Sequence, residues 1–452
     1  MRRATFGPTP ALGASIATMG VSGWIDQQLA PELLDDVKTE NLVAKFPSVG
    51  MDPFELRDTY QDRREPIVSD LTSVRLIRAI YSERQLYETM VGFWTDHFNT
   101  DMSISPIMYL KGVDEREVIR PHALGRFSDM LLASAMSPAM LVYLNNASSR
   151  ADGNNVPNEN YARELLELHT VGVEGGYDEQ DVAEVAHVLS GWTVDSDTAK
   201  MWFNPAWHSM ESVKSVLGWK PNGLTGQAAG ESLIEHLAHL PQTAKFIATK
   251  LCRHFVADSP PPALVDRVAA EYLATETEIG PVMRMILTSE EFADTSLEKV
   301  RRPFELIAAQ SRSVGLDVSS TEPGELRVVS QLLRQMGEPI YTWPSPDGPP
   351  DVASPWINAG TMLQRWNLTL SLTAGDLQAA SVDIEQHRPV DPANSADFIE
   401  LMAAGLGVPL DDITRQAGRT VLDSTADPTN PTTDELADLT AVLLVSPAAQ
   451  RR

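Results

Sequence analysis

Apolar residues recur at three- and four-residue steps along most of the chain, and this spacing constrains the fold more than any other feature. The longest run extends from Val74 to Trp94. Further runs follow at 127–136, 182–189, 233–240, 244–255, 263–274, 282–287, 300–314 and 326–336. Alternating runs that would indicate strands are confined to Met201–Phe203 and Thr420–Leu422. The sequence therefore predicts an all-α protein, a large multi-helix globular array with long ordered loops and few or no short strands.

The length of 452 residues allows two or three domains, or one large helical domain. The helical pattern is interrupted at 195–230, at the proline-rich stretch 342–350 and at the polar stretch 426–433. We expect a main helical domain at residues 1–315 that carries the motifs described below. A C-terminal helical segment, residues 316–452, is expected to pack on it, and one continuous domain is the alternative.

The charge balance limits the partners that the chain can have. Acidic residues outnumber basic ones by 62 to 36, which gives a formal net charge of -26. Such a surface repels phosphate groups, so we expect no nucleic acid partner, although an acidic face that aids solubility explains the charge equally well. The single cysteine, Cys252, excludes an intrachain disulfide and a cysteine metal cluster.

The sequence gives few indications of cellular location. No stretch reaches the roughly 18 apolar residues of a transmembrane helix. The first residues, with Arg2 and Arg3 followed by a proline-containing stretch, show no export signal. Location therefore stays open, with the cytoplasm as the default expectation unless an upstream leader is missing.

The densest group of polar side chains lies at residues 157–170, where three glutamates, an arginine, two asparagines, a tyrosine and a histidine alternate with apolar residues. Asn158 stands at the expected N-cap of a helix that ends near Gly172, and Asp178 opens the next helix. The two helices should form an αα-hairpin. This run is the best candidate for a functional centre.

The glutamates of this run suggest two roles. Glu164 and Glu167 lie one turn apart, so they can share a proton or hold a metal ion. Glu159, Arg163 and Glu167 are spaced by four residues, which equally suits a ladder of structural ion pairs. The position of His169 does not match the Glu-x-x-His spacing of di-iron bundles.

Three other clusters carry polar or aromatic side chains. His97 follows a long apolar helix, where it suits a metal ligand, a general base or a residue that satisfies the helix C-terminus. The basic cluster Arg120, His122 and Arg126 suits an anionic substrate group, or it pairs with acidic residues such as Glu164 and Glu167. The aromatic stretch with Trp192, Trp202, Trp207, His208 and Trp219 suits either a cleft wall or a cap on the core.

Several catalytic signatures are absent from the sequence. There is no glycine-rich dinucleotide or Walker loop, no His-Glu-x-x-His, no Gly-x-Ser-x-Gly and no EF-hand loop. Their absence argues against nucleotide-dependent, zincin and α/β-hydrolase activities.

Taken together, these segments resemble a large bacterial family known as domain of unknown function 1800. The matching segments are 3–7, 93–94, 97–99, 122–125, 137–144, 158–167 and 191–192, and a closing motif from Met336 through Pro344, Gly348 and Trp356 to Arg365. The resemblance implies no established activity. It implies that members are often exported and are often encoded beside a sulfatase- or phosphatase-like protein, a candidate partner. Ser209 departs from the family pattern, in which an aspartate follows His208.

The first functional hypothesis is a metal-dependent enzyme with a carboxylate and histidine site in a helical cleft. Its candidate catalytic residues are Glu164, Glu167, His97, His122 and Arg163. Its candidate substrate-binding residues are Asn160, Tyr161, Arg120, Trp192, Trp202 and His208. The candidate metal ligands are His97, Glu164 and Glu167, a donor set that favours iron or manganese.

The second hypothesis is a non-catalytic binding or envelope-associated protein. In it, the glutamates of 159–167 and Arg163 form a structural ion network with Arg120 and Arg126. Removal of one partner from a buried ion pair typically costs about 3–5 kcal/mol.

Overall fold

A computed structural model of the chain describes residues 1–211, 213–295, 297–376 and 380–452. The helices of the first half are α1 (Pro10–Gln28), α2 (Val37–Val43), α3 (Pro53–Tyr60), α4 (Arg64–Tyr81), α5 (Gln85–His97), α6 (Ile107–Asp114), α7 (Arg120–His122), α8 (Phe127–Ala135), α9 (Pro138–Tyr143), α10 (Asn160–Glu164) and α11 (Glu179–Leu189). Those of the second half are α12 (Gly226–Ala238), α13 (Pro241–Phe255), α14 (Pro262–Ala274), α15 (Ile279–Leu287), α16 (Glu290–Asp294), α17 (Pro303–Ser313), α18 (Arg327–Gln335), α19 (Ala359–Thr373), α20 (Ser395–Gly405), α21 (Asp412–Leu422) and α22 (Thr433–Val445).

The remaining elements are short. Two π-helices span Glu115–Ile119 and Leu165–His169. Single 3-10 turns span Pro31–Leu33, Pro47–Val49, Asn146–Ser148, Ser354–Trp356 and Ile384–His387. Strands β1 (Trp192–Val194) and β2 (Met201–Phe203) pair antiparallel. The all-α prediction is confirmed.

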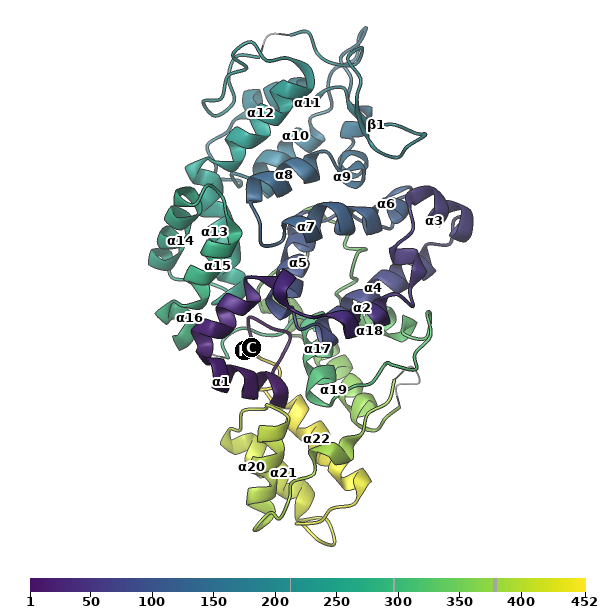
Figure 1. The fold of residues 1–452 in the computed structure, drawn as a ribbon, viewed down its shortest axis with the longest axis vertical. Helices are drawn as coiled ribbons and strands as arrows, with labels where there is room; N and C mark the ends of the chain where they lie inside the picture. Colours follow the sequence, from purple (N-terminus) through teal and green to yellow (C-terminus); the bar gives the residue numbers. More distant parts are fainter. Residues whose placement is uncertain (212, 296, 377–379) are drawn as a thin grey trace.

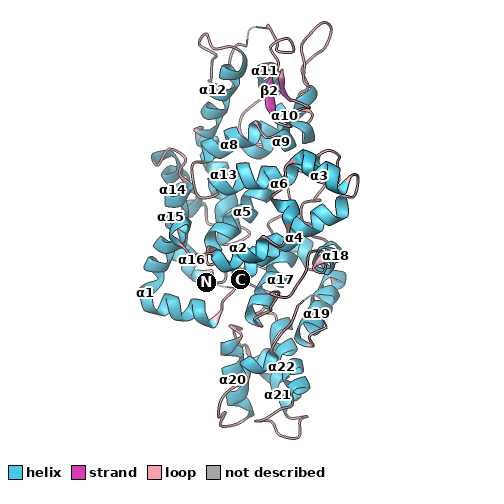
Figure 2. Cartoon of the chain, turned by 45° about the vertical axis from the view of Figure 1, so that its right-hand side comes forward, coloured by secondary structure: helices cyan, strands magenta, loops and turns pink. Residues whose placement is uncertain are grey.

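The molecule is elongated (Figure 1). Helices α8 to α12 and the strand β1 form one end, and α20 to α22 form the other. The two chain termini lie near each other in the middle of the molecule, and the turned view in Figure 2 agrees. Within the described ranges, no helix is both long and apolar enough to cross a bilayer.

Local sequence explains where several helices begin and end. The long apolar run predicted from Val74 to Trp94 is divided between α4 and α5, because Ser82 adopts an extended conformation with ψ 134°. Asp178 opens α11 as predicted, and its side chain accepts hydrogen bonds from the backbone N–H groups of Gln180 and Asp181.

One of the two predicted strands is wrong. Met201–Phe203 is β2, but Thr420–Leu422 forms the last turn of α21. The side chain of Asp411 caps that helix, and α21 packs on α22. Capping and packing thus outweigh the weak strand preference of two β-branched residues. The strand β1, which pairs with β2, was not predicted.

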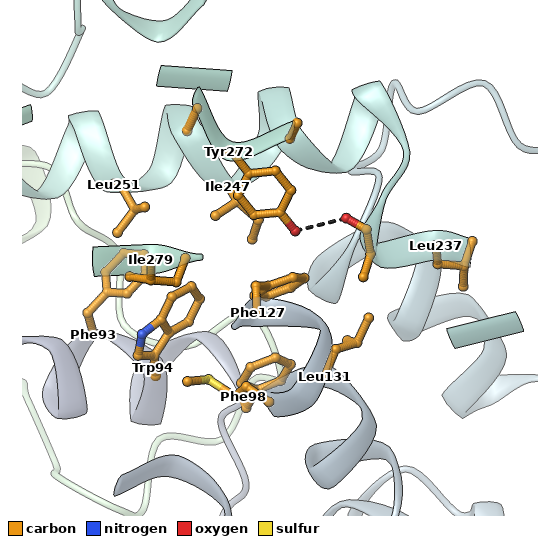
Figure 3. Packing of buried hydrophobic residues seen from close by; sticks show 14 of the residues in the cluster. Phe93, Trp94, Phe98, Phe127, Leu131, Leu237, Ile247, Leu251, Tyr272 and Ile279 are labelled. Carbon is orange, nitrogen blue, oxygen red and sulfur yellow. Dashed lines mark hydrogen bonds between the residues drawn. The ribbon is translucent and has the colours of Figure 1, made fainter. Parts of the chain in front are cut away.

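The first of two apolar cores surrounds α5, α8 and α12 to α15 (Figure 3). Trp94, Phe98 and Phe127 are at most 1% exposed, and their rings lie 5.6–6.3 Å from one another. The indole N–H of Trp94 donates to the carbonyl oxygen of Ala123 at 3.0 Å, so this buried polar group is satisfied. Such packing fixes α5 firmly against its neighbours.

The second core joins residues that lie far apart in the sequence. Ile77 of α4, Ile307 of α17, Leu333 of α18 and Leu368 of α19 belong to one buried cluster. This cluster contains residues on both sides of position 315, where the sequence suggested a domain boundary. The division at 315 stays a prediction.

Candidate functional site

A cavity of about 330 Å³ lies between α5 and α13, and we call it the α5–α13 cavity. Its third wall is the segment 342–352, which we call the proline loop. The lining residues are Phe93, Asp96, His97, Leu168, Phe246, Lys250, Arg253, His254, Arg302, Asp347, Gly348, Pro349, Pro350, Asp351 and Val352. The wall combines aromatic and aliphatic side chains with acidic, basic and histidine side chains, and concave sites that hold convergent polar groups are typical of small-molecule binding.

A larger hollow of about 910 Å³ lies near α4 and α18. It is lined mainly by exposed charged side chains, among them Asp62, Arg63 and Arg64. A shallow, hydrated depression of this kind does not strengthen charged interactions in the way that a partly enclosed cavity does. The α5–α13 cavity is therefore the better candidate for chemistry.

Lys250 and His97 form the central contact of the cavity. The imidazole Nε2 of His97 lies 3.2 Å from the carbonyl oxygen of His169, and its Nδ1 lies 2.8 Å from Nζ of Lys250. A carbonyl oxygen only accepts, so Nε2 carries the hydrogen. Nδ1 then has the free lone pair and accepts a hydrogen bond from the lysine. The backbone of His169 thereby fixes the tautomer of His97.

Burial disfavours the charged forms of the groups at this contact. It lowers the pKa of His97 well below 6.5, with a further contribution from the charge of Lys250. Burial also lowers the pKa of His169 to about 3. The pKa of Lys250 falls to about 8 for the same reason, although the carboxylate of Asp96 opposes the shift. A substantial fraction of Lys250 is therefore an uncharged amine at mildly alkaline pH.

The proline loop is held against the end of α5. The side-chain amide of Asn99 donates to the carbonyl oxygens of Trp343 at 3.0 Å and Ser345 at 2.8 Å. Gly348 has φ +73°, and a Cβ there would collide with the carbonyl oxygen of Asp96. Only glycine permits both this conformation and this close approach. The loop thus closes one side of the cavity at a fixed distance from α5.

A buried ion network supports the cavity, and we call it the Arg302 network. Arg302, the residue before α17, lies 2.7 Å from a carboxylate oxygen of Asp96 and 3.3 Å from one of Glu338. Arg75 lies 3.8 Å from the other oxygen of Asp96. Burial raises the pKa of Glu338 to about 7, although the charge of Arg302 opposes the shift. The network joins α4, α5 and α17.

The same network reaches Asp351 of the proline loop through Glu305, which lies 4.0 Å from Arg302 and 3.0 Å from Arg452. The carboxylate of Asp351 lies 2.6 Å from Nδ1 of His254, 3.0 Å from Nζ of Lys299 and 3.9 Å from Arg452. Burial would raise the pKa of Asp351, but the neighbouring cations outweigh it and hold this pKa well below its usual value. Asp351 is therefore ionised, and His254 is fixed with a hydrogen on Nδ1.

The polar run 157–170 lies beside the cavity and forms α10 and the π-helix Leu165–His169. Leu168 lines the cavity, whereas Glu164 and Glu167 are half-buried outside its lining. Burial raises the pKa of Glu164, and the charges of Glu167 and Asp347 add to this shift. Because Asp347 lines the cavity, the two glutamates lie near its edge.

Comparison with known proteins agrees with these motifs. Residues 1–451 match the family model described as Protein of unknown function (DUF1800). The chain belongs to this family. No match was found among curated proteins or among solved structures. Two segments that carry the family resemblance, 93–99 and the closing motif, supply residues of the cavity wall, and the segment 158–167 immediately precedes Leu168.

The metal site predicted from the sequence is not found among the described residues. Among the described residues, no three His, Cys, Asp or Glu side chains are placed to hold a metal ion together. Both ring nitrogens of His97 are already engaged, one by the carbonyl oxygen of His169 and one by Lys250. His97, Glu164 and Glu167 therefore do not form, in this structure, the iron or manganese site that was expected.

Other predicted residues of the 157–170 run face in different directions. Arg163 pairs with Glu179 at 2.7 Å and with Glu159 at 3.4 Å on the exposed side. Asn160 is exposed at the start of α10. Tyr161 is 1% exposed and lies in the apolar core, where a substrate cannot reach it. None of the three lines the cavity.

The predicted basic cluster is divided between two separate sets of ion pairs. Arg120 binds Glu88 through both guanidinium Nη atoms, and Arg126 pairs with Glu278 at 2.9 Å. His122 is half-buried, and burial lowers its pKa. The predicted network that links Arg120 and Arg126 to the glutamates of 159–167 is therefore wrong in its partners.

The predicted aromatic rim lies elsewhere, near the end of the molecule that carries β1 (Figure 1). Trp192 is fully buried, and Trp202 is 48% exposed. His208 lines a second cavity of about 510 Å³ together with His187 and Ser209. None of the three predicted residues contributes to the wall of the α5–α13 cavity.

Sequence reasoning missed the face of α13 that lines the cavity. Phe246, Lys250 and His254 are spaced by four residues, so they lie on one face of the helix. His254 is buried, and it also lines the cavity. A lysine on the same helical stripe as an aromatic residue and a histidine is the signal that could have found this face.

Substitution of Arg302 tests the Arg302 network. Arg302→Met leaves the buried carboxylates of Asp96 and Glu338 without their main partner, so we expect it to lower the free energy of unfolding by about 3–5 kcal/mol. Arg163→Met removes an exposed pair and should cost about 0–1 kcal/mol. Urea denaturation at neutral pH measures both. Equal losses for the two variants would contradict a structural role for the network.

The buried histidines predict a dependence of stability on pH. The pKa of His169 is about 3 in the folded protein, whereas an unfolded histidine has a pKa of about 6.5. As the pH falls below 6.5, the unfolded chain binds a proton that the folded protein does not, so the free energy of unfolding falls until about pH 3. Above pH 6.5 this contribution to stability is fully present.

His169→Leu removes this difference in proton binding. We expect the slope of the free energy of unfolding between pH 6 and pH 4 to decrease by up to about 1.4 kcal/mol per pH unit. Chemical denaturation of both proteins at several pH values gives the slopes. The slope is compared, rather than the absolute stability, because the substitution also changes packing. An unchanged slope would show that His169 titrates normally.

Proposed function

We propose that the chain is an enzyme that binds a small molecule in the α5–α13 cavity and acts on it through the amine of Lys250. The observation that carries this proposal is the setting of Lys250. Its Nζ contacts a neutral imidazole, and no carboxylate in the described ranges forms an ion pair with it. A buried lysine that has a lowered pKa and no direct carboxylate partner can act as a base or a nucleophile.

Other lysines of the chain show what a structural lysine looks like. Lys111 is buried and pairs with Asp114 at 2.9 Å, and Lys299 is buried between Asp258 and Asp351. In both, the ammonium charge is compensated by carboxylates, as expected for ions removed from water. Lys250 differs because its direct partner, His97, is uncharged. This contrast supports a chemical rather than a structural role.

A non-catalytic binding protein is the second candidate function, and the Arg302 network favours it. The network ties α4, α5, α17 and the proline loop together, as a structural ion network should. Its members differ from those expected from the sequence, since Glu159 and Glu164 are not part of it. A partnership with a sulfatase- or phosphatase-like protein stays a prediction from the family resemblance.

The stability of a lysine variant separates these two functions. Replacement of a desolvated group that lacks a charge partner usually stabilises a protein, so we expect Lys250→Met to gain about 0.5–2 kcal/mol. Lys111→Met, which leaves Asp114 unpaired in the core, should instead lose about 3–5 kcal/mol. Thermal and urea denaturation measure both. A loss of similar size for Lys250→Met would assign Lys250 to the structural framework.

Chemical labelling tests the reactive amine directly. Acetic anhydride modifies only the uncharged form of a lysine, so the labelling rate as a function of pH reports its pKa. We expect half-maximal labelling of Lys250 near pH 8, below the value of about 10.4 for an ordinary lysine. Peptide mass spectrometry follows Lys250 and the exposed Lys220 in one sample. A midpoint near 10 for Lys250, or labelling only after unfolding, would refute the proposal.

A further inference from the structure

Lys250 and Arg253 lie three positions apart on α13, and both line the α5–α13 cavity. Side chains at this spacing are neighbours on a helix surface. The guanidinium Nε of Arg253 donates to the carbonyl oxygen of Asp258 at 3.3 Å. In the described part of the chain, its two Nη groups make no hydrogen bond and no ion pair. A planar pair of free donors therefore lies beside the lysine amine.

The chemistry of these two groups selects a ligand. Two parallel N–H donors of an arginine match the two oxygens of a carboxylate. A lysine amine in an apolar cavity attacks electrophilic carbon, of which an aldehyde or ketone carbonyl is the common case. The rest of the wall combines the apolar side chains of Phe93, Phe246 and Leu168 with the proline loop and with the carboxylates of Asp96, Asp347 and Asp351. The cavity thus suits a small molecule that carries a carboxylate, a carbonyl and a short apolar body.

A histidine with an unpaired ring nitrogen belongs to the same wall. Nδ1 of His254 donates to the carboxylate of Asp351 at 2.6 Å, which leaves the lone pair on Nε2. This Nε2 is buried and has no hydrogen-bond partner among the described residues. An unpaired acceptor in a buried position is unfavourable unless a ligand or substrate uses it. His254 thus places an unpaired basic nitrogen directly behind the cavity wall.

We propose that Lys250 forms an imine with the carbonyl carbon of a small oxo acid, and that Arg253 holds the carboxylate of this substrate. The amine nitrogen attacks the carbonyl carbon, a carbon–nitrogen bond forms, and the electron pair of the carbonyl moves to its oxygen. That oxygen takes up the proton released by the nitrogen. The carbon–oxygen bond then breaks, and the oxygen leaves as water with a second proton, the one that the ammonium ion of Lys250 gave up when it became an amine.

The step is balanced without a further reactant. One carbonyl group and one lysine ammonium ion yield one iminium ion and one water molecule, so charge and atoms are conserved. No oxidant or reductant is needed. This inference rests on the proposed function, because it requires the uncharged amine of Lys250, and it adds the class of substrate and the covalent bond.

Reductive trapping tests the imine in the full-length protein. The protein is incubated with pyruvate or with acetone in the presence of sodium cyanoborohydride, which reduces an iminium ion to a stable amine. Peptide mass spectrometry then compares modification at Lys250 with that at Lys245, an exposed residue of the same helix that pairs with Asp266. With pyruvate we expect at least about tenfold more modification at Lys250 than at Lys245. Lys250→Arg should abolish the product at this position, and Lys245→Arg should leave it unchanged.

Acetone reports on the role of Arg253, because it has the carbonyl but lacks the carboxylate. The charge of Arg253 also lowers the pKa of Lys250, so Arg253→Met should slow trapping of both compounds, but we expect it to reduce trapping of pyruvate about tenfold more than trapping of acetone. Equal trapping of both compounds in the wild-type protein and in this variant would overturn the carboxylate site. No trapping at Lys250, while acetic anhydride still labels it near pH 8, would overturn the imine and leave the proposed function intact. Failure of both reagents at Lys250 would refute the proposed function itself.

Discussion

The ion pair between Arg302 and Asp96 connects the parts of the chain on which the cavity depends. Asp96 belongs to α5, Arg302 precedes α17, and the second carboxylate on Arg302 comes from Glu338, four residues before the proline loop. Arg302 is 5% exposed, so water does little to solvate its charge. A buried guanidinium requires nearby carboxylates, and this requirement holds α5, α17 and the approach to the proline loop in one arrangement.

The helices were predictable because the features that create them are local. Apolar faces at three- and four-residue spacing and the cap at Asp178 are written in neighbouring residues. The second core was not predictable in this way, because it brings Ile77 of α4 against α18, more than 200 residues later. No pattern within one helix indicates which distant helix covers it. The incorrect strand prediction at Thr420–Leu422 relied too much on local sequence. A strand preference over three residues is too weak to compete with a capped helix that packs on its neighbour.

The candidate site was only partly predictable, for a related reason. His97 was recognised as a polar residue at the end of an apolar helix, and it contacts Lys250 in the cavity, where Asn99 holds the proline loop. The prediction that His97 is a metal ligand did not anticipate its two contacts. One ring nitrogen contacts a carbonyl oxygen of a π-helix, and the other contacts a lysine of α13. Lys250 attracted no notice, since a single lysine on an amphipathic helix is usually solvated. Whether a carboxylate pairs with Lys250 depends on tertiary packing, which the sequence of one helix does not show.

The Arg302 network also explains why Lys250 lacks a carboxylate partner. It therefore connects the two functional hypotheses that the sequence left open, the enzyme and the structural ion network. Asp96 and Asp351 both line the cavity, and either could neutralise a lysine ammonium ion. Asp96 is instead taken up by Arg302 and Arg75, and Asp351 by His254 and Lys299. Neither forms an ion pair with Lys250, and burial outweighs the remaining attraction of Asp96, Asp351 and Asp347 and lowers the pKa of the lysine to about 8. The structural network is therefore a condition for the reactive amine, because a carboxylate released from it would restore the charge of Lys250.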